Sequence, residues 1–276
     1  MNGMNWRGIR AVMRKDLKVV TRSKMIMLPM IILPVILLVI FPLLFGLAAI
    51  FGGDMLAGEM DDFRQMMGMM PPQLLEQWQG LDMNALFFQL MAVYAFAPMF
   101  LIVPMMVASV IAADSFVGER ERKTLEALLY TPLTNRELLA AKMLTALLAA
   151  LVVELLGFVL YAVVVNAVGW PLMGRIFFPN VTWIIMVVWL GPAVAALGLG
   201  LTVLISSRVS TFQEAYQLGG IVVLPIVALM IGQFAGVVYF GPGLVLGLGL
   251  VVWIIDAVIV WFGVQTFDRD ALLARL

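Results

Sequence analysis

The stretch MIMLPMIILPVILLVIFPLLFGLAAIF, residues 25–51, decides the fold class of this chain. It contains no charged side chain, and it is longer than the ~20 apolar residues that carry an α-helix across a bilayer. The apolar region of a secretory signal peptide is much shorter, about 7 to 15 residues. The stretch is therefore predicted to be a membrane-spanning helix that stays in the mature protein.

Five more apolar runs follow along the 276 residues, at 86–113, 143–168, 181–205, 218–238 and 244–264. The composition agrees, because 63% of the residues are hydrophobic and 12% are charged, against about 45–50% and about 25% in soluble domains. Six spans use roughly 120 residues, which leaves no room for a separate soluble catalytic domain. We predict an all-α integral membrane protein with six spans, in which residues 1–276 form a single domain.

The residue types that are missing exclude several functions. The chain has no Cys and no His, which removes His-ligated zinc, haem, iron–sulfur clusters, thiol nucleophiles and Ser-His-Asp triads. These absences weaken an intramembrane enzyme as the function and leave only a carboxylate pair for its chemistry. We predict no catalytic, metal-binding or cofactor-binding residue. The formal net charge is zero, which disfavours nucleic acid as a partner because such binding needs a concentrated basic surface.

The basic residues predict the orientation in the membrane. If both termini are cytoplasmic, 15 of the 17 Lys and Arg residues face the cytoplasm, and only Arg64 and Arg175 face outward. Cytoplasmic loops of membrane proteins carry this excess of positive charge. We therefore predict a multi-pass protein of the plasma membrane with a cytoplasmic N-terminal segment 1–24, an external loop 52–85, a cytoplasmic loop 114–142 and a cytoplasmic tail 265–276.

The N-terminal segment 1–24 predicts an amphipathic helix. Its apolar residues recur at steps of three and four from Trp6 to Val20, and its basic residues from Arg7 to Arg22 fall on the opposite side. Such a helix lies flat at the membrane surface and turns its cations toward anionic headgroups or a partner. Two interpretations stay open: a helix that only anchors the first span, or one that also contacts a partner.

The cytoplasmic loop 114–142 predicts two helices separated by a turn. Residues 118–123 are densely charged, and a leucine stripe follows them. Thr131 precedes Pro132, and a residue before proline avoids the helical conformation, so the first helix ends there. Thr134 and Glu137 form an S/T-x-x-E capping box, which starts a second helix that continues through Lys142 into the third span.

The loop sequence GERERKTLEALLYTPLTNRELLAAK, residues 118–142, resembles the signature of the permeases of ABC exporters of the second type, the ABC-2 class. The signature comprises E-R-E, T-L-E, a leucine pair, T-P-L-[ST] and R-E-L with a trailing Lys. The layout of six spans behind a basic amphipathic helix agrees with this class. Within it, the chain looks most like the sodium-efflux and multidrug-type permeases.

The resemblance implies how the chain works. A coupling helix at about 118–129 would fit into a groove of a separate ATPase subunit. The chain contains no G-x-x-x-x-G-K-[ST] phosphate loop of its own, so the resemblance implies a transport subunit and not an enzyme. ATP and Mg would be bound by that partner. Two copies of the permease and two ATPase subunits are expected, with the substrate path between the permeases in the lipid bilayer. The predicted coupling residues are Glu119, Arg120, Glu121, Arg122, Thr124, Leu125 and Glu126.

Two carboxylic acids lie inside predicted spans, Glu154 in the third and Asp256 in the sixth. Neither span carries a basic residue that could pair with its acid, so the ionised form would be costly. One interpretation is a substrate or proton site, and the other is a protonated, hydrogen-bonded group at a helix or subunit contact. Asn166 and Gln233 lie near the predicted external ends, where water can solvate them.

Other features leave alternatives. The break at 239–243, YFGPG, predicts either a tight turn or a pair of re-entrant half-helices between spans five and six. The acidic, Met-rich external loop predicts an ordinary solvated loop rather than a cation or soft-metal site, because its spacing does not make its ligands converge. The alternative function is an ATP-independent secondary transporter, in which the charged loop serves only topology.

Overall fold

The computed structural model of the chain describes residues 4–51, 68, 78, 80–124, 132–206, 208–235 and 237–266. These residues are overwhelmingly helical, as the sequence predicts, and the described part contains no β-strand. Most of the external loop 52–85, the leucine stripe of the cytoplasmic loop and the C-terminal tail lie outside the described residues.

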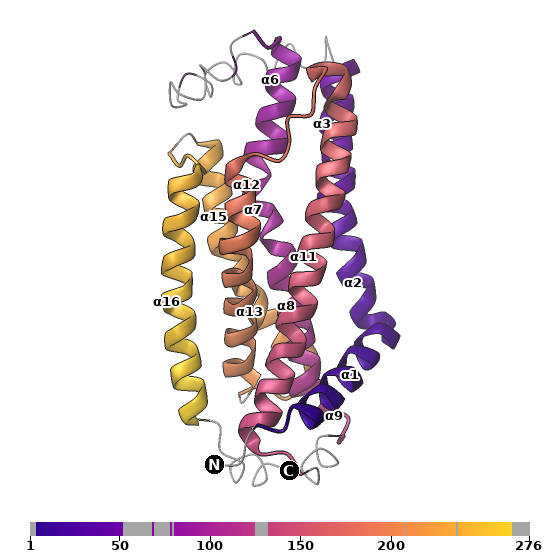
Figure 1. Ribbon diagram of the computed structural model, residues 1–276, viewed down its shortest axis with the longest axis vertical. Coiled ribbons are helices and arrows are strands. Elements are labelled where there is room, and N and C mark those ends of the chain that lie inside the picture. The colour runs from indigo at the N-terminus through magenta and orange to yellow at the C-terminus, as the bar shows by residue number, and fades with distance from the viewer. Residues whose placement is uncertain are drawn as a thin grey trace.

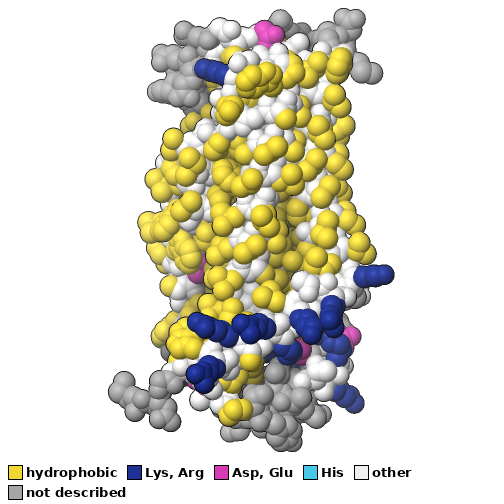
Figure 2. Space-filling view, turned by 45° about the vertical axis from the view of Figure 1, so that its right-hand side comes forward, with side chains coloured by type: hydrophobic (Ala, Val, Ile, Leu, Met, Phe, Trp, Pro, Cys, Tyr) yellow, Lys and Arg dark blue, Asp and Glu magenta, His cyan; other side chains and the backbone are white. Residues whose placement is uncertain are grey.

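Six helices are long and apolar enough to cross a membrane, in agreement with the predicted number: Ile26–Phe51, Ala97–Glu121, Arg136–Met173, Val181–Ser206, Phe212–Phe234 and Pro242–Trp261. The described chain begins and ends at the same end of the bundle (Figure 1). Figure 2 shows a broad hydrophobic surface along the bundle, with Lys and Arg side chains gathered at that end. We call it the basic end.

The first part of the chain runs along the outside of the bundle. It comprises the amphipathic helix α1 (Trp6–Arg22), then α2 (Lys24–Val35), a π-helical turn η1 (Ile36–Ile40) and α3 (Phe41–Phe51). Only Ser23 separates α1 from α2. In Figure 1, α1 turns away from the direction of α2 at the basic end. The apolar face of α1 packs against a long helix of the third span, α11 (Asn135–Met173).

The second span is the centre of the bundle. It consists of α6 (Met83–Gln89), the π-helical turn η2 (Leu90–Ala95), α7 (Ala97–Phe100), α8 (Ile102–Ala113), the π-helical turn η3 (Asp114–Gly118) and α9 (Glu119–Glu121). Every residue of α8 from Val103 to Ala113 is buried, between α11 on one side and the fourth span on the other.

The fourth span comprises α12 (Val181–Ile185), the π-helical turn η4 (Met186–Leu190) and α13 (Gly191–Ser206). Gly198 lets α13 approach α8 closely, because a Cβ atom there would lie 2.7 Å from Ser109 Oγ and 2.8 Å from Met105 Cγ. Small residues at helix contacts inside membranes allow this close backbone packing.

The fifth span comprises α14 (Phe212–Gly219), a 3-10 turn η5 (Gly220–Val222) and α15 (Val223–Phe234). The sixth is α16 (Pro242–Thr266), which packs against α13. Between them, the N–H groups of Val237 and Val238 both donate to Gly232 O, at 2.9 and 3.0 Å. Within the break, Tyr239 to Gly241 are not helical and α16 begins at Pro242; both alternatives for 239–243 stay predictions.

Prolines inside the spans explain two of the π-helical turns, η1 and η4. A proline lacks an N–H donor and its ring pushes away the carbonyl four residues earlier, so the preceding turn widens. Phe41, just before Pro42, accordingly donates its N–H to the carbonyl five residues back, that of Ile36. Gly191, just before Pro192, does the same with Met186.

The irregular turn η2 in the second span has its backbone satisfied by other spans. In lipid, a free carbonyl has no water to bond to, so irregular backbone requires partners from the protein. Pro98 has no N–H to donate to the carbonyl of Tyr94, four residues before it, so a side-chain donor takes the place of that N–H. The carbonyls of Ala92, Val93 and Tyr94 accept hydrogen bonds from Tyr161 Oη of α11, from Trp183 Nε1 of α12 (2.7 Å) and from Gln233 Nε2 of α15 (2.7 Å).

Asn166 and Gln233, which lie near the predicted external ends, are half-buried and also bond within the protein. Gln233 closes the broken turn η2. Asn166 holds the connection between α11 and α12, where its Oδ1 accepts from the N–H groups of Phe177 and Phe178 and its Nδ2 donates to Phe178 O at 2.7 Å. Both amides make hydrogen bonds to backbone groups that their positions near the span ends did not predict.

Candidate functional site

The charged run of the signature begins at the end of the second span's helix. The helix of this span ends at Glu121, since Arg122 has a ψ of 0° and Lys123 a left-handed φ of 56°. The prediction of one continuous helix over 118–129 is therefore wrong: the chain is helical up to Glu121 and leaves the helix at Arg122. The charged side chains at this helix end bond to their own span and to neighbouring elements. Residues 125–131, which include the leucine stripe, lie outside the described residues.

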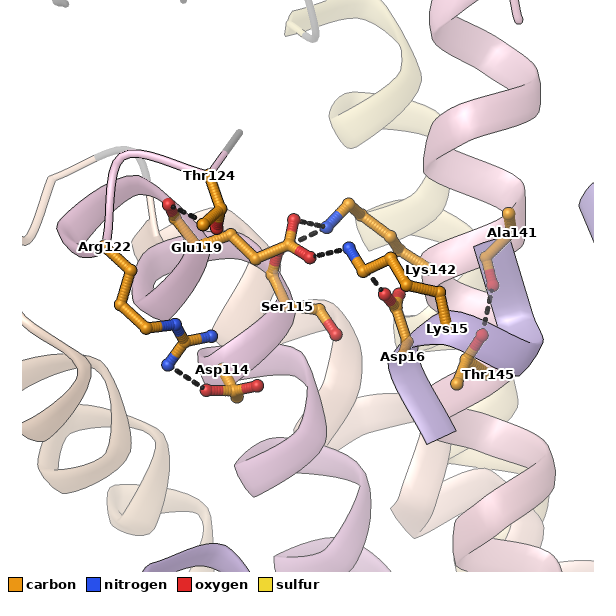
Figure 3. Close-up of polar contacts among 10 residues, drawn as sticks. All are labelled: Lys15, Asp16, Asp114, Ser115, Glu119, Arg122, Thr124, Ala141, Lys142 and Thr145. Carbon is orange, nitrogen blue, oxygen red and sulfur yellow. Dashed lines mark hydrogen bonds and ion pairs between the residues drawn. The ribbon is translucent and has the colours of Figure 1, made fainter. Parts of the chain in front are cut away.

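Glu119 stands at the centre of a buried ion-pair cluster (Figure 3). Its Oε2 lies 2.5 Å from Lys142 Nζ of α11, and its Oε1 accepts from Lys15 Nζ of α1. The side chains of Glu119 and Lys142 are 5% and 2% exposed, whereas that of Lys15 is 39% exposed. Lys142 Nζ also donates to Ser115 O. One carboxylate thus joins the second span, α11 and α1.

Asp16 completes this cluster, which we call the Glu119 cluster: Lys15, Asp16, Glu119 and Lys142. Asp16 is buried, and its Oδ1 lies 3.1 Å from Lys15 Nζ, within ion-pair distance but without hydrogen-bond geometry. Burial raises the pKa of Asp16, and the positive charges of Lys142 and Lys15 only partly oppose it. The pKa of Lys15 is also raised, since the hydrogen bond to Glu119 and the charge of Asp16 outweigh its burial.

The next residues of the run tie the second span to the connection between α13 and α14. Arg120 donates to Ser206 O at 3.1 Å and to Val209 O. Glu121 Oε2 accepts from the N–H of Phe212 at 2.9 Å. Because that N–H belongs to the first turn of α14 and has no helical partner, the carboxylate stabilises the start of α14.

Arg122 and Thr124 fold back onto the second span. Arg122 Nη1 lies 2.8 Å from Oδ1 of Asp114, the first residue of η3. The hydrogen bond between them raises the pKa of the Arg122 guanidinium. Gly118 makes room for the pair, because a Cβ there would lie 2.8 Å from Asp114 Oδ1 and 3.1 Å from Arg122 Nη1. The N–H of Thr124 donates to Glu119 O at 2.9 Å.

The second half of the cytoplasmic loop returns to α1. The predicted capping box is confirmed: Glu137 N donates to Thr134 Oγ1 at 3.3 Å, and Thr134 N donates to Glu137 Oε2 at 2.8 Å. Glu137 Oε1 also accepts from the N–H of Asn5 at 2.6 Å, which fixes the start of α1. Below it, Leu133 packs in a small apolar cluster with residues of α1 and α11: Ile9, Val12, Leu138 and Ala141.

Most of the predicted coupling residues therefore have intramolecular partners. Glu119, Arg120, Glu121, Arg122 and Thr124 all bond within the chain, and Leu125 and Glu126 lie outside the described residues. Sequence reasoning missed Lys15, Asp16 and Asp114 as members of the site. Little in the sequence indicated this role, since Lys15 and Asp16 have the pattern of ordinary surface charges on an amphipathic helix. Lys142 was present in the signature, but its partner was not evident.

The comparisons with known proteins identify the family. The family model described as "ABC-2 family transporter protein" matches residues 10–243, which is most of the chain. The chain belongs to the ABC-2 transporter family. Searches of the curated proteins and of the solved structures found no match. Membership agrees with the resemblance of the cytoplasmic loop, and it makes the chain a multi-pass membrane component of an ABC transporter, which implies an ATPase partner rather than catalysis by this chain.

The two intramembrane acids of this ABC-2 protein are both buried. Glu154 of α11 is 1% exposed, and its Oε1 has no hydrogen-bond partner. The carboxyl group occupies the space beside Gly191 of α13, where a Cβ atom would lie 1.6 Å from Oε1. Asp256 of α16 is 5% exposed, and neither of its oxygens has a partner. Glu154 Oε1 and both oxygens of Asp256 therefore lack a hydrogen-bond partner among the described residues of this one chain, and both interpretations stay predictions.

No group of three or more acidic, His or Cys side chains comes together in the described part of the ABC-2 chain to hold a metal ion. Glu154 and Asp256 lie on helices that pack against α13 from different positions in the bundle, α11 and α16. Each is therefore a single acid in apolar surroundings. An ionised carboxylate there would be costly unless a group from outside its own helix paired with it.

Proposed function

We propose that this chain is the permease subunit of an ABC exporter, which works as two copies with two copies of a separate ATPase subunit. Membership of the ABC-2 family carries this proposal. The chain itself has no phosphate-binding loop, so ATP and Mg are bound and ATP is hydrolysed by the partner. The substrate path lies between the two permease copies, and both termini face the cytoplasm, as the positive-inside distribution predicts.

The Glu119 cluster supports a route by which the ATPase moves the permease. The charged run follows directly on the buried second span, so a push on the loop acts on the centre of the bundle. Glu119 passes this movement to α11 through Lys142 and to α1 through Lys15. Arg120 and Glu121 pass it to the start of α14. One short segment at the end of the second span is thus bonded to three other elements that must shift in alternating access: α1, α11 and α14.

The loop that follows Thr124 is then the part that meets the ATPase. Glu119, Arg120, Glu121, Arg122 and Thr124 position this loop, because their polar groups are already bonded within the chain. Leu125 and Glu126 follow immediately in the signature, and we propose that Glu126 makes charge-assisted contacts with the partner. Removing the Glu119 cluster should uncouple transport from ATP hydrolysis, whereas changing Glu126 should weaken the complex itself.

The exported substrate is proposed from the resemblance and from the intramembrane acids. The sodium-efflux and multidrug-type permeases suggest a small cation or an amphiphilic drug. Glu154 and Asp256 are the proposed contacts for such a substrate or for a proton, since each is a buried acid with an oxygen that has no hydrogen-bond partner among the described residues. In transport assays with these candidate substrates, Glu154→Gln should abolish transport while leaving assembly intact. Unchanged transport would eliminate this role.

Co-purification tests the permease assignment. The full chain with an affinity tag, expressed in its own cells and extracted in mild detergent, should bring down a protein that carries a phosphate-binding loop. Native mass spectrometry should give two copies of each chain. Glu126→Lys should reduce the amount of ATPase recovered, whereas Arg175→Gln, at the other end of the molecule, should not. A chain that purifies alone and transports without an ATPase would instead be a secondary transporter.

A further inference from the structure

Five cations form one continuous stripe along α1. They recur at steps of three and four residues, so they share one face of the helix, and all of them are exposed: Arg7, Arg10, Arg14, Lys18 and Arg22. Within the described residues, none of the five forms an ion pair with a carboxylate. Like charges at this spacing repel one another, so the stripe is a surface without its counter-charge.

The acids nearest in the sequence and fold do not neutralise this stripe. Asp16 lies on the opposite, buried face of α1, and Glu119 lies beneath the helix. Both belong to the Glu119 cluster, where Lys15 and Lys142 balance their two charges. The cluster is therefore neutral in itself, and the stripe keeps five positive charges that an anionic surface can meet.

The stripe adjoins the surface that faces lipid. Only Ser23 separates α1 from α2, whose Leu28, Ile31 and Ile32 are 55%, 51% and 50% exposed. Figure 2 shows Lys and Arg side chains in a row at the border between the hydrophobic surface and the basic end. Trp6 and Leu17, 53% and 38% exposed, lie on one flank of the stripe. Tryptophan and long cationic side chains prefer this boundary between hydrocarbon and headgroups.

We propose that the basic stripe of α1 binds the headgroups of anionic phospholipids, so that the membrane itself holds this helix in place. The apolar face of α1 is already packed against α11 and Leu133, so the helix does not insert its apolar face into lipid. Its contact with the bilayer consists of the cations and the flank of Trp6 and Leu17. Each cation near an anionic surface should strengthen the association about fivefold. The proposal requires no ATPase and stands apart from the function proposed above.

Brominated lipids test this proposal on the full chain. The protein is reconstituted in phosphatidylcholine vesicles that contain brominated phosphatidylglycerol or brominated phosphatidylcholine, and quenching of tryptophan fluorescence is measured. The difference between the wild type and Trp6→Phe isolates the signal of Trp6, one helical turn from Arg10. Brominated phosphatidylglycerol should quench Trp6 with an apparent association constant at least fivefold higher than brominated phosphatidylcholine, and salt should reduce this preference.

Paired variants separate charge on the stripe from charge elsewhere. Arg10→Gln with Arg14→Gln should lower the preference for phosphatidylglycerol at least fivefold, whereas Arg10→Lys with Arg14→Lys should keep it. Arg175→Gln with Arg208→Gln removes the same charge elsewhere and should also keep it. Unchanged unfolding temperatures would show that all variants fold.

Two results would overturn the proposal. One is quenching of Trp6 that does not depend on the headgroup. The other is a preference that survives in the double Gln variant while co-purification of the ATPase is lost, which would assign the stripe to a protein partner.

Discussion

Glu119→Gln should destabilise the protein strongly, although the substitution removes only one charge. In the wild type, Glu119 balances Lys142, whose side chain is 2% exposed, at 2.5 Å, and it also accepts from Lys15. Gln cannot balance a buried ammonium. Breaking a buried ion pair by removing one partner costs about 3 to 5 kcal/mol. Lys15 adds little to this figure, because it is 39% exposed and water screens its charge.

We take the lower value, about 3 kcal/mol, because Asp16 stays near Lys142 and offsets part of the lost charge. For a protein of this size, this corresponds to a fall in unfolding temperature of about 6 to 12 °C. The measurement is thermal unfolding of the purified protein in detergent, followed by tryptophan fluorescence. Glu121→Gln is the matched control, since Glu121 is exposed and accepts a single hydrogen bond from Phe212 N; its loss should be about 1 kcal/mol or less.

A double variant separates the ion pair from other effects of the substitution. Glu119→Gln combined with Lys142→Met removes both buried charges, so the double variant should unfold at a higher temperature than Glu119→Gln alone. The reasoning would be refuted if Glu119→Gln unfolded within about 2 °C of the wild type, or if the two substitutions were additive in the double variant.

Three further substitutions test other parts of the structure by the same unfolding measurement. Gly191→Ala should destabilise by about 1 to 3 kcal/mol, because the added Cβ would lie 1.6 Å from Glu154 Oε1. Combining it with Glu154→Ala should recover part of the loss, and a double variant no better than the single one would contradict this contact. Trp183→Phe should cost about 1 to 3 kcal/mol because it leaves Val93 O in the membrane without its donor; an unchanged midpoint would show that this carbonyl needs no side-chain partner. Asp16→Asn should raise the unfolding temperature at pH 7, because the raised pKa of Asp16 means that its ionised form is less favourable in the folded state than in the unfolded state. This penalty of ionisation is absent at pH values below the ordinary pKa of 3.8 and grows as the pH rises through the raised pKa. The advantage of the variant should therefore shrink as the pH falls toward 4, and an advantage that is independent of pH would contradict the assignment.

The sequence was sufficient for the features that depend on local composition. Uninterrupted apolar runs predicted six spans, and Thr134 with Glu137 predicted the start of the third-span helix, because both signals involve residues close together in the chain. The π-helical turns before Pro42 and Pro192 also have a local cause, because a proline inside a helix removes a backbone hydrogen bond.

The features that sequence reasoning missed depend on partners far along the chain. The helix at Glu119 was predicted to continue because a leucine stripe follows the charged run and because the resemblance implies a coupling helix, yet it ends at Glu121. Lys15 lies 104 residues from Glu119, and Gln233 lies 139 residues from Tyr94. Periodicity within one helix cannot reveal such pairs, so the interior of the site required the fold.

A cross-link from the cytoplasmic loop tests the central claim most directly, namely that this loop joins the permease to a separate ATPase. The chain contains no cysteine, so Glu126→Cys provides a single attachment point for a maleimide linked to a photoreactive group. In membranes of its own cells, this variant should cross-link to a protein that carries a phosphate-binding loop, whereas Arg175→Cys should not. Absence of that product at position 126, or equal products at both positions, would contradict the account.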